Sequence, residues 1–296
     1  MFAVETEYLP ISVYAVEDVE PFPQGAKALV ENKLTQLLTR NGVAGMNYLG
    51  QFILTVTTTP LDKDVIAGPP AKIAEKMELN FYIVDAYAQT IFSSTSITLR
   101  GLGETENKCY MDALSRIPLQ SPQLAQFVNE GKQKIITYYN HEAANIIKRA
   151  QVLAKQKQYE EALSLVSLIP QQCDHYDEAI AASLEIYQQY IDNECNINLA
   201  AARREWAAAQ NALGAAAAGE YLAKILPDAG CYDDAIALYN EIKAKVLEDW
   251  QFEMKKYQDG VDLQKLQIDA ARQIGVAYGT HQPAQTTSIE FLRTLL

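Results

Sequence analysis

The stretch that decides the fold is residues 81–117, FYIVDAYAQTIFSSTSITLRGLGETENKCYMDALSRI. Two runs rich in β-branched and aromatic residues, Met77 to Ala86 and Thr90 to Arg100, are separated by only three residues, which predicts an antiparallel β-hairpin. Gly101-Leu-Gly103 ends the second strand, and residues 104–117 place apolar side chains at helical spacing. The stretch therefore predicts a strand, a turn, a second strand and a helix.

Three further elements are predicted upstream of this stretch. Residues 8–18 alternate as a half-buried strand, and residues 25–40 carry apolar side chains at helical spacing. Residues 51–60 form another β-rich run, and Gly68-Pro69-Pro70 separates it from the strand that begins at Met77. We expect residues 8–117 to form a small, mostly antiparallel sheet with helices on one face. The expected core includes Leu79, Phe81, Ile83, Phe92 and Leu114.

The second half of the chain keeps only the helical period, from about Asn140 onward. A motif in residues 168–180, a proline followed by a cysteine and then Tyr-Asp-x-Ala, recurs in residues 225–236. Internal repeats of this kind are typical of stacked helical pairs. From Tyr232 to Tyr278 the helical period is almost unbroken, which predicts a long C-terminal helix.

Residues 150–170 resemble a tetratricopeptide repeat. Tyr159, Ala162, Leu163 and Pro170 occupy positions that such repeats use for helix contacts and for ending the second helix. The spacing between the two copies of the motif exceeds the ~34 residues of such repeats, so the resemblance implies an irregular array.

The predicted organisation is an α+β protein with three parts. Residues 1–120 form an assembly domain, residues 121–280 a tetratricopeptide-like helical region, and residues 281–296 a polar linker and docking tail. The tail ends in an apolar stripe on one side of a short predicted helix, which needs a surface to bury it. The predicted partner-docking residues are Ile289, Phe291, Leu292, Leu295 and Leu296. The stripe docks on a neighbouring subunit or folds back on its own chain.

The hairpin, the glycines and the following helix together resemble the amino-terminal domains of TolB and of the curli-secretion channel subunit. The similarity covers residues 8–117. It rests on two strands, of which the second ends in glycines, and on a following helix that contains the pair Ala113-Leu114. The upstream helix that ends LTQLLTRNG is also similar. The resemblance implies an assembly module and supplies no catalytic residues.

Composition and charge exclude several classes of protein. The chain of 296 residues is 49% hydrophobic and 21% charged, which is typical of a globular protein. A net charge of −12, with no concentrated basic patch, disfavours direct binding of nucleic acid. No stretch approaches the ~20 apolar residues needed to span a bilayer, so we expect no membrane span.

Four cysteines, Cys109, Cys173, Cys195 and Cys231, occur without any Cys-x-x-Cys pair. This spacing disfavours a zinc ribbon or a redox motif, and we expect buried thiols. A disulfide between Cys173 and Cys195 is the alternative.

Candidate chemistry is sparse. Gly101-Leu-Gly103-Glu104-Thr105-Glu106 begins like a dinucleotide fingerprint, but Glu106 replaces the third glycine and its charge repels a pyrophosphate. A tight strand-to-helix turn, whose acidic side chains complement the helix dipole, explains the same residues. His175 beside Asp174 and Asp177 suggests either a cation site or helix capping, and capping is favoured. We expect no catalytic, metal or cofactor-binding residues.

The leading hypothesis for function is a non-enzymatic structural or adaptor subunit of a multi-subunit, ring-shaped assembly, such as a phage virion connector or tail ring component. It implies protein partners, a homo-oligomer and location in a virion. The alternative is a bacterial periplasmic or lipid-anchored envelope protein that binds partner proteins through its helical repeats. An enzyme that uses a carboxylate pair is a third hypothesis.

Overall fold

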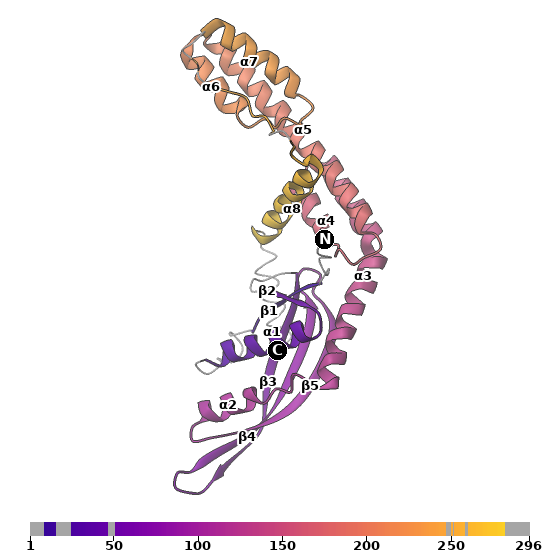
Figure 1. Ribbon diagram of the computed structural model, residues 1–296, viewed down its shortest axis with the longest axis vertical. Helices are drawn as coiled ribbons and strands as arrows, with labels where there is room; N and C mark the ends of the chain where they lie inside the picture. The colour runs from indigo at the N-terminus through magenta and orange to yellow at the C-terminus, as the bar shows by residue number, and fades with distance from the viewer. Residues whose placement is uncertain are drawn as a thin grey trace. The chain divides into compact units, whose positions relative to one another are not determined.

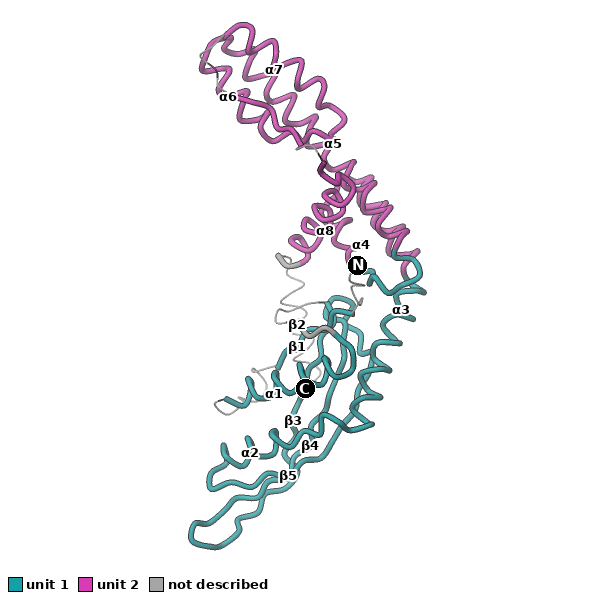
Figure 2. Tube along the Cα trace, viewed as in Figure 1, with its two compact units in different colours: residues 1–142, 168–176, 280–296 teal, residues 143–167, 177–279 magenta. Residues whose placement is uncertain are grey.

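The computed structural model shows a chain that divides into two compact units (Figures 1 and 2). The structure describes residues 9–15, 25–46, 51–246, 250, 252–257 and 260–281. The first unit contains residues 1–142, 168–176 and 280–296, and the second contains residues 143–167 and 177–279.

The first unit contains a sheet of five strands in the order β2-β1-β3-β4-β5. β1 pairs in parallel with β2 and β3, whereas β3, β4 and β5 pair antiparallel in sequence order. The strands are β1 (Pro10–Val13), β2 (Ala44–Met46), β3 (Phe52–Ile66), β4 (Lys72–Asp85) and β5 (Thr90–Gly103). The predicted α+β class and the predicted antiparallel pairing of the β4 and β5 residues are both confirmed.

One face of this sheet is covered by α3 (Pro122–Lys155). Phe81 of β4 makes an edge-to-face contact with Phe127 of α3, with ring centroids 6.3 Å apart. One turn further along α3, a Cβ at Gly131 would lie 2.6 Å from the Cδ1 atom of Ile83. Alternation along β4 therefore places Phe81 and Ile83 beneath α3. Val84, which is also fully buried, faces the other side of the sheet and packs with Ile53 and Ala86.

The short helix α2 (Glu106–Ser115) packs on the same face. Gly101 lies opposite Glu75 in the sheet, so it shares the face of Phe81 by strand alternation. A Cβ at Gly101 would lie 2.0 Å from the Cys109 carbonyl oxygen, and one at Gly103 would lie 2.3 Å from the Cys109 nitrogen. Only glycine permits this approach. α1 (Ala26–Arg40) in turn contacts α2, so the helices gather on one face as predicted.

The core of the first unit lies between this face and the helices. All five residues predicted for it are buried, with exposed fractions between 0% and 6%. They are Leu79, Phe81, Ile83, Phe92 and Leu114.

The hairpin of β3 and β4 is longer than predicted. Its ladder continues through an irregularity between Pro60 and Asp62 to the pair Ile66 and Lys72. Residues 59–72, here called the arm, are all exposed. Because no side chain of the arm is buried, apolar and polar residues need not alternate along it. The sequence therefore contains no strand pattern beyond Pro60.

The second unit is helical, as predicted for the C-terminal region. Its helices, besides the last turns of α3, are α4 (Tyr159–Ser167), α5 (Tyr176–Ala208), α6 (Ala212–Leu222), α7 (Tyr232–Val246) and α8 (Leu263–His281).

The C-terminal region is not one continuous helix, and that detail of the prediction is wrong. α7 ends at Val246, and residues 252–257 have no regular structure. Trp250 is buried, stacks on Phe252 with ring centroids 5.3 Å apart, and lies 3.5 Å from a Cβ position at Gly219. Burial of large aromatic side chains stabilises a non-helical path more than helical periodicity alone stabilises a helix.

Cys173 and Cys231 each lie in a turn just before a helix. The Tyr176 N–H donates to the Cys173 carbonyl at 3.1 Å, and the Tyr232 N–H donates to the Ala229 carbonyl at 3.0 Å. The equivalence of the two corners and the tetratricopeptide-like repeats stay predictions. The boundary predicted at residue 120 precedes α3, whose first turns bury Leu124 and Phe127 in the first unit.

We predict that Gly101→Ala lowers the free energy of unfolding by about 1–3 kcal/mol, because the added methyl group overlaps the backbone of α2. Urea denaturation measures the change. Gly68→Ala is the matched control, since its Cβ would meet its nearest atom at 3.6 Å, an ordinary contact. Equal stability of the two variants would contradict the close packing of α2 on β5.

Candidate docking surfaces

A buried carboxylate organises the first unit. Asp85, at the end of β4, has no exposed surface. Its Oδ1 atom accepts the backbone N–H groups of Tyr87 and Ala88, both at 2.8 Å. Its Oδ2 atom accepts the Tyr139 hydroxyl at 2.5 Å and the Gln51 amide at 3.1 Å. Four donors therefore satisfy the carboxylate and join the residue before β3, the β4–β5 turn and α3.

This cluster is structural and is closed to a substrate. Tyr139 is 2% exposed, and burial, followed by the charge of Asp85, raises the pKa of its phenol. The phenol therefore remains a hydrogen-bond donor at all physiological pH values. The ring centroid of the adjacent Tyr138 lies 5.2 Å from that of Tyr139 and 5.5 Å from that of Phe92. The carboxylate thus fixes the part of α3 that faces the start of β5.

An open hollow of about 500 Å³ lies at that position. Its walls include Thr90 and Phe92 from β5 and Thr137 and Tyr138 from α3, with Lys134 at the same wall. Phe92 reaches the helix face because the β4–β5 register shifts between Ile83 and Val84. An aromatic floor with a few polar groups is the surface that commonly accepts a side chain of another molecule.

The arm is the second exposed feature of the first unit. Three large apolar side chains on it are solvent-accessible: Leu61 is 48% exposed, Val65 is 71% exposed and Ile66 is 50% exposed. Lys63 of the arm forms a solvent-exposed ion pair with Glu106 of α2. Val65 and Ile66 are consecutive strand residues and face opposite sides of the hairpin, so a partner that encloses the hairpin can contact both.

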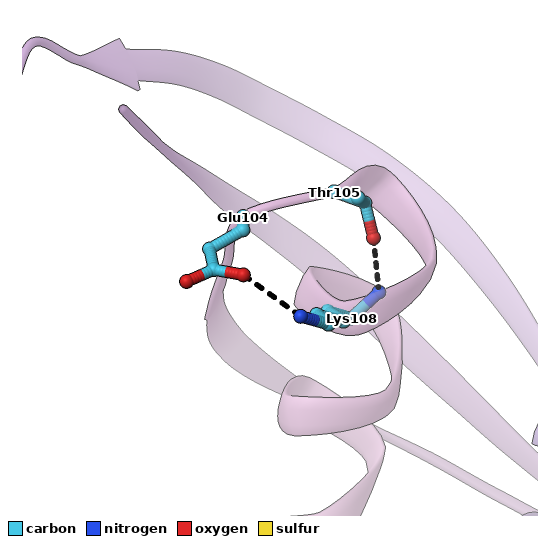
Figure 3. Close-up of polar contacts among 3 residues, drawn as sticks. All are labelled: Glu104, Thr105 and Lys108. Atoms are coloured by element: carbon cyan, nitrogen blue, oxygen red, sulfur yellow. Dashed lines mark hydrogen bonds and ion pairs between the residues drawn. The ribbon is translucent and has the colours of Figure 1, made fainter. Parts of the chain in front are cut away.

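The turn from β5 into α2 explains the glycine-rich motif (Figure 3). The Thr105 side chain accepts the Lys108 N–H at 3.2 Å and caps the helix. Glu104 accepts the Lys108 ammonium at 2.8 Å. The glycines permit α2 to lie on β5, and the acidic residues complete the turn. The helix start is thus occupied by the chain's own capping groups.

In the second unit, a smaller hollow of about 300 Å³ is lined by tyrosine and glutamate side chains. They include Tyr159, Tyr190, Tyr278, Glu160, Glu161 and Glu194, and one cation, Lys157, also lines the hollow. The rings of Tyr159 and Tyr190 make an edge-to-face contact at 6.0 Å. Burial, followed by the charges of Glu194 and Glu160, raises the pKa of Tyr190. Close by, Gly275 of α8 packs directly on the Leu163 backbone of α4.

Cys195 and Cys231 form a disulfide, with Cα atoms 6.0 Å apart. It links α5 to the residue that precedes α7. The expectation of four buried thiols is therefore wrong, and so is the alternative pair Cys173 and Cys195. Cys109 and Cys173 are the buried free thiols, and burial raises the pKa of Cys173 to about 11. Partners 36 residues apart cannot be chosen from sequence spacing alone.

The loop with His175 contains no assembled cation site. Asp174 instead accepts the Asn140 amide at 2.8 Å and donates its own N–H to the Asn140 side-chain oxygen at 2.9 Å. Within the described ranges, no three His, Cys, Asp or Glu side chains are grouped to hold a metal ion. No helix in those ranges is long and apolar enough to cross a membrane.

The predicted docking residues Ile289, Phe291, Leu292, Leu295 and Leu296 lie outside the described residues. The arm, the hollow beside Phe92 and the Asp85 cluster were not predicted. Asp85 just before a short turn between two strands was a usable signal, because aspartate side chains accept the N–H groups of such turns. Tyr139 lies 54 residues from Asp85 in the sequence, so no local pattern predicts that these two residues meet.

No model of a known protein family matches the chain, and no curated protein matches it. Among solved structures, one match is a minor lipoprotein from Acinetobacter baumannii. It is 24% identical, with coverage of 43% of this chain and 91% of that chain, and the TM-score is 0.26. A similarity at this TM-score carries no argument about fold or function.

We predict that Tyr139→Phe lowers the free energy of unfolding by about 1–3 kcal/mol, because one charge-assisted hydrogen bond to the buried carboxylate is lost. Urea denaturation of the full chain measures it. Tyr138→Phe is the matched control on the next residue, and we expect it to change stability by less than about 0.5 kcal/mol. If the free energy of unfolding falls equally in both variants, the hydrogen bond from the Tyr139 hydroxyl to Asp85 does not specifically stabilise the fold.

We predict that the non-reduced, denatured protein contains two titratable thiols per chain, Cys109 and Cys173. Reduction of the Cys195–Cys231 bond should cost the second unit about 2–4 kcal/mol, since it frees a loop of 36 residues. Cys195→Ser should reproduce the loss, and Cys173→Ser tests a cysteine outside the bond. Four titratable thiols in protein purified without reductant would refute the pairing.

Proposed function

We propose that the chain is a non-enzymatic structural or adaptor subunit of a multi-subunit assembly outside the cytosol, and that the arm is one of its contacts. The arm is the single observation that carries this proposal. Its fourteen residues, 59–72, are all exposed, and three of them present large apolar side chains. A partner surface that covers Val65 and Ile66 recovers the hydrophobic free energy that the isolated chain forgoes.

The composition of the arm supports a contact with a defined partner. Pro60, the register shift beside it and the charged run Asp62-Lys63-Asp64 protect the β3 edge from pairing with other strands. The apolar side chains therefore remain available while indiscriminate edge pairing is suppressed. This combination suits a subunit that must stay soluble until it meets its neighbour.

The disulfide supports a location outside the cytosol, because structural disulfides persist in oxidising compartments and are rare in reducing ones. Between the bacterial envelope and a virion, we favour the bacterial envelope as the location, because the periplasm oxidises thiols while the chain folds. A virion connector or tail ring component is the second candidate setting, and a virion surface also preserves disulfides. We further propose a homo-oligomer, of which a ring is the closed form.

Two other surfaces extend the proposal. The apolar residues of the predicted tail, from Ile289 to Leu296, are a candidate second contact to a neighbouring subunit. The acidic tyrosine-lined hollow of the second unit favours a cationic group on a partner, since tyrosine faces and carboxylates both attract cations. Neither surface is needed for the test of the arm.

We predict that Val65→Ser combined with Ile66→Ser weakens assembly at least tenfold, about 1.4 kcal/mol, and leaves the fold intact. Sedimentation velocity across a concentration series measures assembly, and circular dichroism checks the fold. Leu213→Ser, which changes an 80% exposed leucine in the second unit, is the matched control. Unchanged assembly in the arm variant would remove the arm from the proposal.

A further inference from the structure

β5 is the last strand of the sheet, so its outer side is one of the sheet edges. Two hydrogen bonds show which backbone groups of β5 point outward from this edge. The Leu102 N–H donates to the Asp112 carboxylate of α2 at 2.9 Å. The Ser96 carbonyl accepts the Gln123 amide of α3, also at 2.9 Å. Both residues belong to the same alternate set of β5. In an antiparallel ladder, the backbone groups of such a set all point away from the inner partner strand.

Ser94, Thr98 and Arg100 belong to this set and are all exposed. Their outward N–H and C=O groups have no hydrogen-bond partner within the part of the chain that the structure describes. Three residues therefore present six backbone groups along one edge, and an added strand that follows all of them would displace the Gln123 amide from the Ser96 carbonyl between Ser94 and Thr98. This is the arrangement to which an added strand binds.

The two long edges of the sheet differ in how they are protected. β1 pairs with β3 only as far as Leu54, and the remainder of the β3 edge carries Pro60, a register shift and three charged residues. From Ser93 to Gly103, β5 contains no proline and keeps a regular register with β4. Its single charged residue there is Arg100. Natural edge strands normally carry protection, so the regular β5 edge is notable.

Arg100 also lies in an uncompensated position. It faces Lys76 directly across the β4–β5 pair. Like charges at opposite positions destabilise a sheet. Asp62 and Glu78 occupy neighbouring positions on β3 and β4, but neither forms an ion pair with these two cations among the described residues. The exposed guanidinium at the edge is thus free to bind a carboxylate.

The hollow lined by Phe92 and Tyr138 lies at the other end of the same strand. Thr90, the first residue of β5, also lines it. A strand added to the edge of β5 would therefore pass Arg100 at one end and this hollow at the other. Main-chain hydrogen bonds supply affinity in such a mode, and side-chain pockets supply specificity.

We propose that the β5 edge binds an extended segment of a different protein, which carries an acidic residue opposite Arg100 and an apolar side chain that enters the hollow beside Phe92. This proposal rests on the adaptor function and names a partner class for it. A second copy of β5 fits less well, because residues 90–103 contain no acidic side chain that would pair with Arg100. Charge complementarity therefore selects a different chain as the occupant.

The test uses a synthetic peptide of about ten residues, long enough to follow β5 at ~3.3 Å per residue. It alternates threonine and valine, with glutamate near the amino end and phenylalanine near the carboxyl end, so that antiparallel binding brings them to Arg100 and to the hollow. Amide hydrogen exchange on the full chain is the readout. We expect the peptide to slow exchange at the Ser94, Thr98 and Arg100 amides at least tenfold.

Two variants and one modified peptide provide the controls. Thr98→Pro removes an outward N–H and is tolerable on an edge, whereas Thr98→Val retains it. We expect at least tenfold weaker peptide binding for Thr98→Pro and for Arg100→Glu, and unchanged binding for Thr98→Val. A peptide that is N-methylated on its pairing amides should not bind.

Absence of protection, or equal binding of the N-methylated peptide, would overturn the proposal. Protection of the same amides that grows with protein concentration and without peptide would also overturn it, because the occupant would then be a second copy. None of these peptide-binding results bears on whether the Val65→Ser, Ile66→Ser variant weakens assembly. Unchanged assembly of the Val65→Ser, Ile66→Ser variant, together with intact peptide binding, would instead refute the arm as a contact and spare the β5 edge.

Discussion

The buried carboxylate of Asp85 is the interaction on which the first unit depends. A charge with no exposed surface is stable only when hydrogen bonds replace its water. Here four donors do so, from the residue before β3, from the β4–β5 turn and from α3. The Tyr139 hydroxyl is the donor that brings the helix to this point. Because α3 is fixed there, Tyr138 faces Phe92, and the hollow at the start of β5 exists. A docking surface thus follows from a buried polar contact.

The exposed parts of the sheet fall into two chemically different kinds, the arm and the β5 edge. The arm carries apolar side chains beside proline and paired charges, so side-chain contacts are available while strand pairing is blocked. The β5 edge has the opposite character, with unpaired backbone groups and small polar side chains. Two chemically different contacts on one sheet suit an adaptor that binds a neighbour and another protein.

The hairpin and the helix after it could be predicted because apolar alternation and the glycines are local signals, and the core from Leu79 to Leu114 followed from them. The break between α7 and α8 could not, since it depends on burial of Trp250 against distant helices. The Cys195–Cys231 pair and the contact of Tyr139 with Asp85 depend on tertiary proximity, which periodicity does not encode. The arm was missed because exposed strands lack alternation.

The central claim is that this chain functions as part of a larger protein assembly. The most direct measurement is the native mass of the full chain, purified without reductant, by native mass spectrometry over a range of concentrations. The account predicts species at whole-number multiples of the 32.9 kDa chain, with one closed stoichiometry dominant. A single species of 32.9 kDa at every concentration would contradict it.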